Sequence, residues 1–239
     1  MKKIYYEIYE DLRTKIIARV YPYQTYIPSE NRLVEAYQCS HNTLRKALSV
    51  LKLHGFVQPI RGKGVLVIWQ PTRRANFVLG DIETFAEAAR RNGLTAFTRV
   101  PVFEHVICDA ALARDTGFSV GDELLHLERI RVIGGSALVR DHSHFLAEAL
   151  PGLTPEIAEQ SIYAYAEEVL GMQITTSNRT VTVEFADSYD REVLDLIDYD
   201  MLAVVGNRTF NDQGIMFEST QSRHRPDYFT FEDTAVRGY

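Results

Sequence analysis

Residues 28–64 of the chain read PSENRLVEAYQCSHNTLRKALSVLKLHGFVQPIRGKG. This stretch contains two short helical patterns, at about 30–37 and 40–54, which are separated by only a few residues. Two short apolar strands follow, at 56–60 and 65–69, with the tetrapeptide RGKG at the turn between them. The order of these elements predicts a helix-turn-helix followed by a β-hairpin wing, an arrangement that is typical of proteins that bind duplex DNA.

The residues before this stretch predict a further helix at about 3–19. Apolar side chains recur there at every fourth position, as one face of a helix requires: Ile4, Ile8, Leu12 and Ile16. Ser29 and Ser40 stand where the N-caps of the next two helices are expected. Residues 1–70 therefore form the expected DNA-binding domain.

Composition limits the class of protein. The chain has 239 residues, of which 46% are apolar and 24% charged, so it can build packed cores. No apolar run approaches the roughly 18 residues that span a bilayer, and no secretion signal is recognisable. The chain contains two cysteines, which is too few for a disulfide framework. We therefore expect a cytoplasmic protein with no membrane partner.

Charge is distributed unevenly along the chain, whose net charge is −6. Residues 1–74 contain 13 Lys+Arg against 5 Asp+Glu, whereas residues 75–239 contain 13 against 27. An excess of positive charge in one segment is typical of a nucleic-acid-binding module attached to a different kind of domain.

The remainder of the chain has a mixed pattern. Residues 71–76, PTRRAN, contain proline and two arginines and are interpreted as a linker. Residues 77–239 alternate strands and helices with several antiparallel turns, which indicates an α+β domain. The expected helices lie at about 83–92, 109–116, 155–170 and 187–196. The expected strands lie near 98–107, on either side of Gly134-Gly135, at 175–185, and on either side of 211–214.

The second predicted helix of the helix-turn-helix carries the candidate DNA-reading side chains. Ser40 caps it, and His41, Thr43 and Arg45 lie in its first two turns, where a recognition helix meets base edges. The wing tip adds two cations on a glycine-containing backbone that can approach a phosphate or a minor groove closely: Arg61, Gly62, Lys63 and Gly64. The sequence therefore predicts double-stranded operator DNA as a partner.

Three segments together, IPSENRLVEAY, SHNTLRKAL and HGFVQPIRGKGVLV, resemble the winged-helix signature of the GntR family of bacterial transcription regulators. This resemblance implies that Asn31, His41 and Arg45 face the DNA and that the wing around Gly62 enters the minor groove. The sequence departs from the family at His41, where arginine is usual, and this departure leaves the operator sequence open.

Three features of the second domain indicate an anionic ligand. Arg129 and Arg131 lie two residues apart on a predicted strand, and hence on one face, where two guanidinium groups can bind a phosphate. Ser161 and Tyr163 stand in a helical segment whose hydroxyls and amides could contribute, and Thr84 opens an earlier helix in the same way. From spacing alone, two alternate arginines on a hairpin are more often part of a solvated or ion-paired surface.

Residues 77–239 also resemble the UTRA effector domain of the HutC branch of GntR regulators, whose fold is similar to that of chorismate lyase. The resemblance implies that phosphate is bound by the Arg-x-Arg strand, the Ser-x-Tyr segment and Thr84, and that acidic side chains hold sugar hydroxyls. The effector-binding residues it implies are Thr84, Arg129, Arg131, Asp141, Ser161, Tyr163, Glu218 and His224.

The tract ESTQSRHRPDYFTFEDTAVRG resembles the trehalose-responsive repressors of this family in Gram-positive bacteria, although Gln221 replaces a usual glutamate. This resemblance implies trehalose 6-phosphate as the effector and a repressor of a trehalose-utilisation operon. We further expect a homodimer, joined through the effector domains, that binds a near-palindromic operator. A HutC-type regulator that responds to another sugar phosphate or small anion is the alternative.

A lyase-like enzyme is an alternative from another class. No serine or cysteine nucleophile stands in a recognisable motif, so no catalytic residue and no cofactor is predicted. His142 and His144 share one strand face and could be metal ligands, but isolated histidine pairs of this kind are more often structural. No metal site is therefore predicted.

Overall fold

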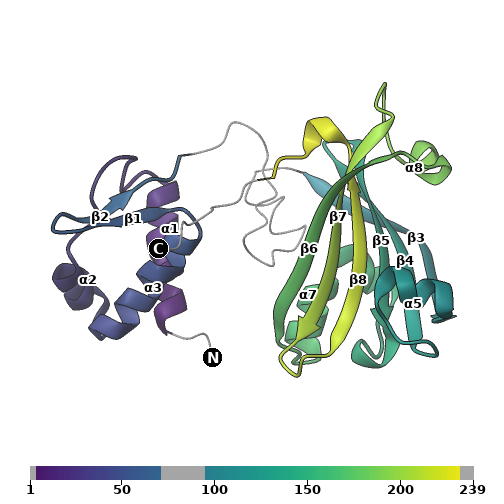
Figure 1. The fold of residues 1–239 in the computed structure, drawn as a ribbon, viewed down its shortest axis with the longest axis horizontal. Helices are drawn as coiled ribbons and strands as arrows, with labels where there is room; N and C mark the ends of the chain where they lie inside the picture. The colour runs from purple at the N-terminus through teal and green to yellow at the C-terminus, as the bar shows by residue number, and fades with distance from the viewer. Residues whose placement is uncertain (1–3, 71–94, 232–239) are drawn as a thin grey trace. The chain divides into compact units, whose positions relative to one another are not determined.

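The computed structural model describes residues 4–70 and 95–231 of the chain (Figure 1). These residues fall into two compact units, which are treated separately below. The expected linker at 71–76, the expected helix at about 83–92 and the candidate residue Thr84 lie outside the described residues.

The first unit has the order of elements that residues 28–64 predict, preceded by one more helix. Its elements are α1 (Ile4–Ile17), α2 (Glu30–Tyr37), α3 (His41–Leu53), β1 (Val57–Ile60) and β2 (Gly64–Val67). The two strands pair in antiparallel register, with Ile60 opposite Gly64 next to the turn. The predicted winged helix-turn-helix is therefore confirmed.

The core of this unit forms where α1 packs against α3. Ile8, Leu12 and Ile16 of α1 are buried, and Leu44 and Leu51 of α3 lie in the same cluster. The recurrence of apolar residues at every fourth position thus predicts the buried face of α1 correctly, except in the first turn, where Ile4 is exposed.

The two predicted N-caps differ. The Ser40 side chain accepts a hydrogen bond from the backbone N–H of Thr43, as a capping serine does. Ser29 precedes α2 at the expected position, but its side chain makes no capping hydrogen bond. Ser29 therefore stands at the predicted N-cap position, and α2 begins where it was predicted, but the expected capping hydrogen bond is not formed.

The second unit is built on one antiparallel sheet of six strands in the order β3-β4-β5-β8-β7-β6 (Figure 1). The strands are β3 (Ala96–Ile107), β4 (Glu123–Ile133), β5 (Ser136–Leu146), β6 (Ile174–Phe185), β7 (Met201–Asn211) and β8 (Met216–His224). The helical elements are α5 (Ala110–Thr116), η1 (Ala147–Ala149), α6 (Pro155–Gln160), α7 (Ile162–Ala164), η2 (Tyr165–Val169), α8 (Ser188–Val193) and η3 (Pro226–Tyr228). The α+β class is confirmed.

Helical elements cover both faces of this sheet. Residues from α6 and α7 pack with Leu125, Leu127 and Phe145, which lie on one face. Residues of α5 pack with Leu124 and Leu146, which point to the opposite face because side chains alternate along a strand. Arg140 on that opposite face bonds to α8. We call the first the effector face and the second the α5/α8 face.

The single helix expected at 155–170 is broken in the structure. Ser161 has an extended backbone (φ −148°, ψ 109°) and ends α6 while it caps α7, its side chain accepting from the N–H of Ala164. The following turn, η2, is π-helical. A serine can satisfy a helix N-terminus with its own side chain, so it stabilises a break that periodicity alone does not reveal. The break turns the Tyr163 side chain toward the sheet, where its hydroxyl meets β7 and β8.

Candidate functional site

The candidate DNA-reading residues lie at the exposed start of α3. His41 and Arg45 are exposed, and Thr43 is half-buried. The hydroxyl of Thr43 lies 2.9 Å from that of Ser40, so these two side chains form the cap of the helix. Asn31 is exposed in the first turn of α2. In this unit the candidate DNA-reading side chains that are exposed to solvent are therefore His41, Arg45 and Asn31, whereas Ser40 and Thr43 form the start of the helix.

Glu30 is a member of this surface that sequence reasoning missed. Its carboxylate accepts a hydrogen bond from Arg45 Nε at 3.1 Å and lies 4.0 Å from His41 Nδ1. An exposed ion pair of this kind contributes little to stability, usually below about 1 kcal/mol. Glu30 therefore orients Arg45 through an exposed pair that can be broken at a small cost in free energy.

The wing tip is exposed along its whole length, from Arg61 to Gly64. Gly62 and Gly64 have φ values of +74° and +117°, in the left-handed region that glycine tolerates best. The glycines thus fix a tight turn that presents Arg61 and Lys63 to solvent.

The candidate effector residues on the sheet share the effector face. Arg129 of β4 is directly opposite Asp141 of β5, and Asp141 is opposite Ser222 of β8. Arg131 and His224 flank Val139 in the same way. The charged side chains here are nearly excluded from water, with residue exposures of 4–7% for Arg129, Arg131, Asp141 and Glu218. Such burial of charge requires close partners.

Arg131 has such partners. Its Nε donates to Asp141 Oδ2 at 2.8 Å, a second nitrogen lies 2.8 Å from the same oxygen, and a third contact reaches Thr98 Oγ1 at 2.6 Å. Ser222 donates to the other oxygen of Asp141 at 2.7 Å. Asp141 is therefore the acceptor around which this part of the face is organised.

Arg129 is held less tightly. Its contacts are longer, at 3.4 Å to Ser143 Oγ and 3.6 Å to Asp141 Oδ2. Its Nε atom is buried and has no hydrogen-bond partner among the described residues. A buried donor without an acceptor is unfavourable by roughly 1–3 kcal/mol. An acceptor supplied by a ligand would satisfy it.

Tyr163 connects α7 to this face. Its hydroxyl donates to Glu218 Oε2 in a short hydrogen bond and lies 3.2 Å from Thr209 Oγ1. Thr220 Oγ1 lies 2.7 Å from the other Glu218 oxygen and 3.0 Å from Ser143 Oγ. A continuous polar chain therefore runs from Tyr163 through Glu218 to the arginines.

The pKa shifts define the charge state of the face at pH 7. Burial lowers the pKa of Arg131 to about 10, although the charge of Asp141 opposes this. Burial alone would raise the pKa of Asp141, but the Arg131 and Arg129 charges leave it below its ordinary value. Burial lowers the pKa of His224 to about 4, and burial together with the Glu218 charge raises that of Tyr163. Arg131 is thus a cation, Asp141 an anion, His224 neutral and Tyr163 a hydrogen-bond donor.

Of the eight candidate effector residues, the structure brings six to one face. They are Arg129, Arg131, Asp141, Tyr163, Glu218 and His224. The Ser161 side chain is used as the cap of α7, and no contact in the described residues joins it to this group. Sequence reasoning missed the hydroxyls of Thr98, Ser143, Thr220 and Ser222. Three of these could have been found from the period of two that they share with Asp141 or Glu218.

The arginines on either side of His224 have another role. Arg223 points to the α5/α8 face and binds Asp190 and Glu184, at 2.8 Å and 2.7 Å. Arg225 binds Asp227 at 2.7 Å. The Arg223 contact with Asp190 attaches α8 to the sheet, whereas the Arg225–Asp227 pair lies within the segment after β8. In the SRHR tract only His224 and Ser222 therefore belong to the effector face.

Fold and site define a two-domain transcriptional regulator, with a DNA-binding winged helix and a separate ligand-binding domain. Residues 4–67 match the family model of bacterial regulatory proteins of the gntR family, and residues 91–230 match that of the UTRA domain. The chain belongs to the GntR family and carries a UTRA effector domain.

Two relatives with this architecture align with nearly the whole chain. The chain is 34% identical to the HTH-type transcriptional regulator TreR of Bacillus subtilis (strain 168), over 97% of this chain and 96% of that protein. It is 25% identical to GmuR of the same organism, over 97% and 98%. These relatives are named as transcriptional regulators, in agreement with the prediction that the chain is not an enzyme.

Two solved structures support the fold. The effector-binding domain of the B. subtilis trehalose repressor (TreR) aligns with a TM-score of 0.55 and 35% identity, covering 60% of this chain and 99% of that one. The possible transcriptional regulator YydK of B. subtilis aligns over 97% and 100% with a TM-score of 0.83, at 18% identity. Within residues 4–70 and 95–231, no helix has the length and apolar character to cross a lipid bilayer.

Proposed function

We propose that the protein represses a trehalose-utilisation operon and that trehalose 6-phosphate, bound on the effector face, releases it from its operator. The similarity to the trehalose repressor over nearly the whole chain supports this choice of ligand. The observation that carries it furthest is the buried pair Arg129 and Arg131, since two guanidinium groups side by side suit a phosphate.

The composition of the effector face favours a ligand that is both an anion and a polyol. Two arginines and two carboxylates, Asp141 and Glu218, leave the face near neutrality, so a bare phosphate would have to displace Asp141 from Arg131 without compensation. Sugar hydroxyls can donate to Asp141 and Glu218 while the phosphate accepts from the arginines. A phosphorylated sugar therefore satisfies both sets of groups at once.

Arg129 gives the phosphate its first hydrogen-bond donor. Its buried Nε is without a partner among the described residues, and its other contacts exceed 3.3 Å. Binding there replaces an unsatisfied donor by a charge-assisted hydrogen bond, which contributes about 1.5–3 kcal/mol. Arg131, which is already bound to Asp141, completes the pair when sugar hydroxyls compete for that carboxylate.

In the proposed mechanism the protein is a homodimer that places two copies of α3 on a near-palindromic operator. Arg45, His41 and Asn31 read base edges, and the wing from Arg61 to Gly64 contacts the backbone and minor groove. Effector binding alters the spacing of the two heads through the linker at 71–76. A coupling free energy of about 1–3 kcal/mol is sufficient for induction.

A gel-shift titration on the DNA upstream of the protein's own gene tests this proposal. Trehalose 6-phosphate should release the DNA, whereas trehalose and inorganic phosphate at equal concentration should not. Arg45→Ala should weaken DNA binding and leave binding of trehalose 6-phosphate unchanged, and Arg131→Ala, if folded, should bind DNA without responding. Release by another sugar phosphate alone would contradict the ligand but retain the class of regulator.

A further inference from the structure

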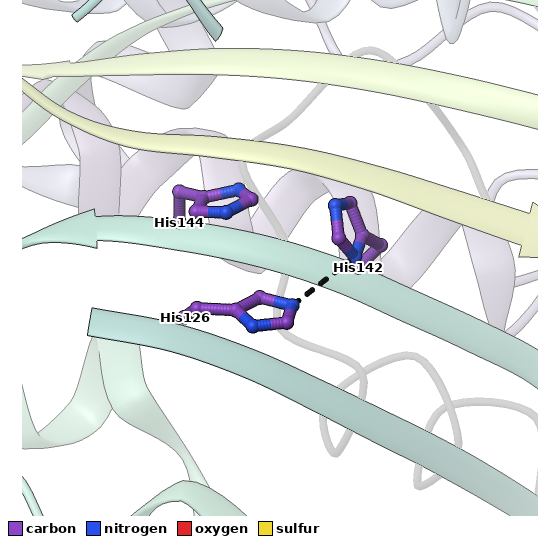
Figure 2. Close-up of side chains that lie close together, drawn as sticks. All are labelled: His126, His142 and His144. Atoms are coloured by element: carbon purple, nitrogen blue, oxygen red, sulfur yellow. Dashed lines mark hydrogen bonds between the residues drawn. The ribbon is translucent and has the colours of Figure 1, made fainter. Parts of the chain in front are cut away.

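Three imidazole rings gather on the α5/α8 face of the sheet, away from the effector face. His126 of β4 and His144 of β5 are cross-strand partners, and His142 lies two residues before His144 on the same side (Figure 2). The ring centroids are 4.8–5.0 Å apart in all three pairs. The strand period of two is therefore what brings the three side chains together.

The ring nitrogens lie at distances close to those in a metal site. One nitrogen from each histidine lies within 4.8 Å of the other two, and His126 Nε2 lies 3.3 Å from His142 Nδ1. A tetrahedral Zn²⁺ with bonds of about 2.0–2.1 Å holds its ligand nitrogens roughly 3.4 Å apart. Side-chain rotations that move the ring nitrogens by roughly 1 Å would bring all three to that spacing.

Two carboxylates hold two of the three rings, those of His126 and His142. His126 Nδ1 lies 2.9 Å from Glu104 Oε1, and His142 Nδ1 lies 2.7 Å from Glu128 Oε1. When the Nδ1–H of His126 donates to Glu104, the Nε2 atom of that ring keeps its lone pair and is oriented for an ion, and the His142 nitrogen that faces it at 3.3 Å is Nδ1. Glu128 Oε1 also lies 3.7 Å from His126 Nε2, close enough to serve as an oxygen ligand after a small movement.

His144 supplies an independent indication. The residue is 5% exposed, and within residues 95–231 it makes ring contacts with His126 and His142 but no hydrogen bond. A cation shared with the neighbouring rings would give the His144 imidazole a ligand bond, and the His142 side chain, 35% exposed, leaves a route from solvent.

We propose that His126, His142 and His144 form a binding site for a divalent transition-metal ion, Zn²⁺ in the first instance. Three imidazoles and a carboxylate are ligands that Zn²⁺ prefers, whereas Mg²⁺ and Ca²⁺ prefer sites made of oxygen. The site joins β4 to β5 on the side opposite to Arg129 and Asp141. It does not depend on the identity of the effector.

The test is a titration of the full-length, chelator-treated protein with ZnCl₂ by calorimetry, and with CoCl₂ by visible absorption. One ion should bind per chain, and Co²⁺ should give the visible bands of a four-coordinate site. His142→Gln should weaken Zn²⁺ binding by at least about 100-fold and abolish the Co²⁺ bands. Glu104→Gln, which changes only an orienting carboxylate, should weaken it by about tenfold.

The matched control is His105→Gln. His105 is exposed on β3 beside Glu104, but it pairs with Leu125 and so points to the other face. Its variant should bind Zn²⁺ as the unaltered protein does. Because His142 is partly exposed, His142→Gln should keep its far-UV circular dichroism, which shows that it is folded. Absence of one-to-one binding, or equal binding by folded His142→Gln, would overturn the proposal.

Discussion

Both faces of the six-stranded sheet bury a pair of arginines, and the two pairs differ in how fully their N–H groups are used. On the α5/α8 face, Arg140 donates twice to Glu128 at 2.8 Å and also reaches Asp187 and Asp190 at 2.9 Å and 3.0 Å. On the effector face, Arg129 has contacts of 3.4 Å and 3.6 Å and an Nε without a partner among the described residues.

The pKa values follow the same division. Burial opposes the charge of Arg140, but hydrogen bonds to Glu128 and Asp190 outweigh it and raise its pKa. For Arg131, burial is the larger influence and lowers the pKa to about 10 despite Asp141. A charge network complete within the protein is typical of structure, whereas one that lacks an acceptor is typical of a binding site. The comparison thus separates a structural network from a candidate effector site of similar composition.

The largest expected effect is on the structural network. Arg140→Met should lower the free energy of unfolding of the effector domain by about 3–5 kcal/mol, because it leaves Glu128 and Asp190 as buried charges with fewer partners. Urea unfolding monitored by circular dichroism measures this change. A loss below about 1 kcal/mol would mean that the α5/α8 network is not structural.

Arg129→Gln should affect ligand affinity rather than stability. Its stability should change by less than about 1 kcal/mol, since few good hydrogen bonds are lost, whereas affinity for trehalose 6-phosphate should fall about 100-fold through loss of a charge-assisted contact. Calorimetric titration and urea unfolding of the same preparation give both quantities. Equal destabilisation by Arg129→Gln and Arg140→Met would erase the distinction between the faces.

Acid should weaken the effector face through His224, which lies among Asp141, Arg131 and the Phe229 ring. Its pKa is about 4 in the folded protein, against 6.5 for an unburied histidine. Between these values the unfolded chain binds a proton that the folded chain does not, so stability falls as pH falls, by about 1.4 kcal/mol per pH unit. His224→Gln should reduce this slope between pH 6.5 and 4 by the contribution of one histidine, while His144, whose pKa burial also lowers to about 4, keeps its own contribution. An unchanged slope would contradict the burial of a neutral imidazole.

The smallest expected effect concerns the DNA-binding unit, whose Glu30–Arg45 ion pair is exposed, unlike the buried networks of the effector domain. Glu30→Gln should change stability by less than about 1 kcal/mol, because the pair with Arg45 is open to solvent. If α3 contacts DNA as proposed, operator affinity should rise slightly, since the change removes a negative charge next to Arg45. A fluorescence-anisotropy titration at fixed salt measures this effect. Much weaker binding would show that Glu30 is needed to position Arg45.

Much of the fold could be predicted from the sequence, because strong local signals agreed. Periodic apolar residues, the Ser40 cap and the glycines of the wing identified the first unit, and Gly134-Gly135 identified the β4–β5 hairpin. The break at Ser161 could not be predicted, because a serine within an otherwise helical pattern leaves both conformations open. The missing capping bond of Ser29 shows the same limit.

The candidate site could be predicted in part. The spacing of Arg129 and Arg131 allowed either a phosphate site or an ion-paired surface. The family resemblance favoured the phosphate site and added Asp141, Glu218 and His224. The sequence could not distinguish Arg129 from the structural Arg140 and Arg223, because that difference depends on which acidic side chains fold against each one. For the same reason, His126 was not joined to His142 and His144, since it lies on another strand.

The most direct test of the central claim combines a change in the protein with a change in the ligand. Binding of trehalose 6-phosphate and of trehalose is measured by calorimetry on the unaltered protein and on Arg129→Gln. We expect the phosphate to increase affinity at least about 100-fold in the unaltered protein, and most of that difference to disappear in the variant. If both proteins discriminate between the two sugars to the same extent, the effector face does not bind the phosphate through Arg129.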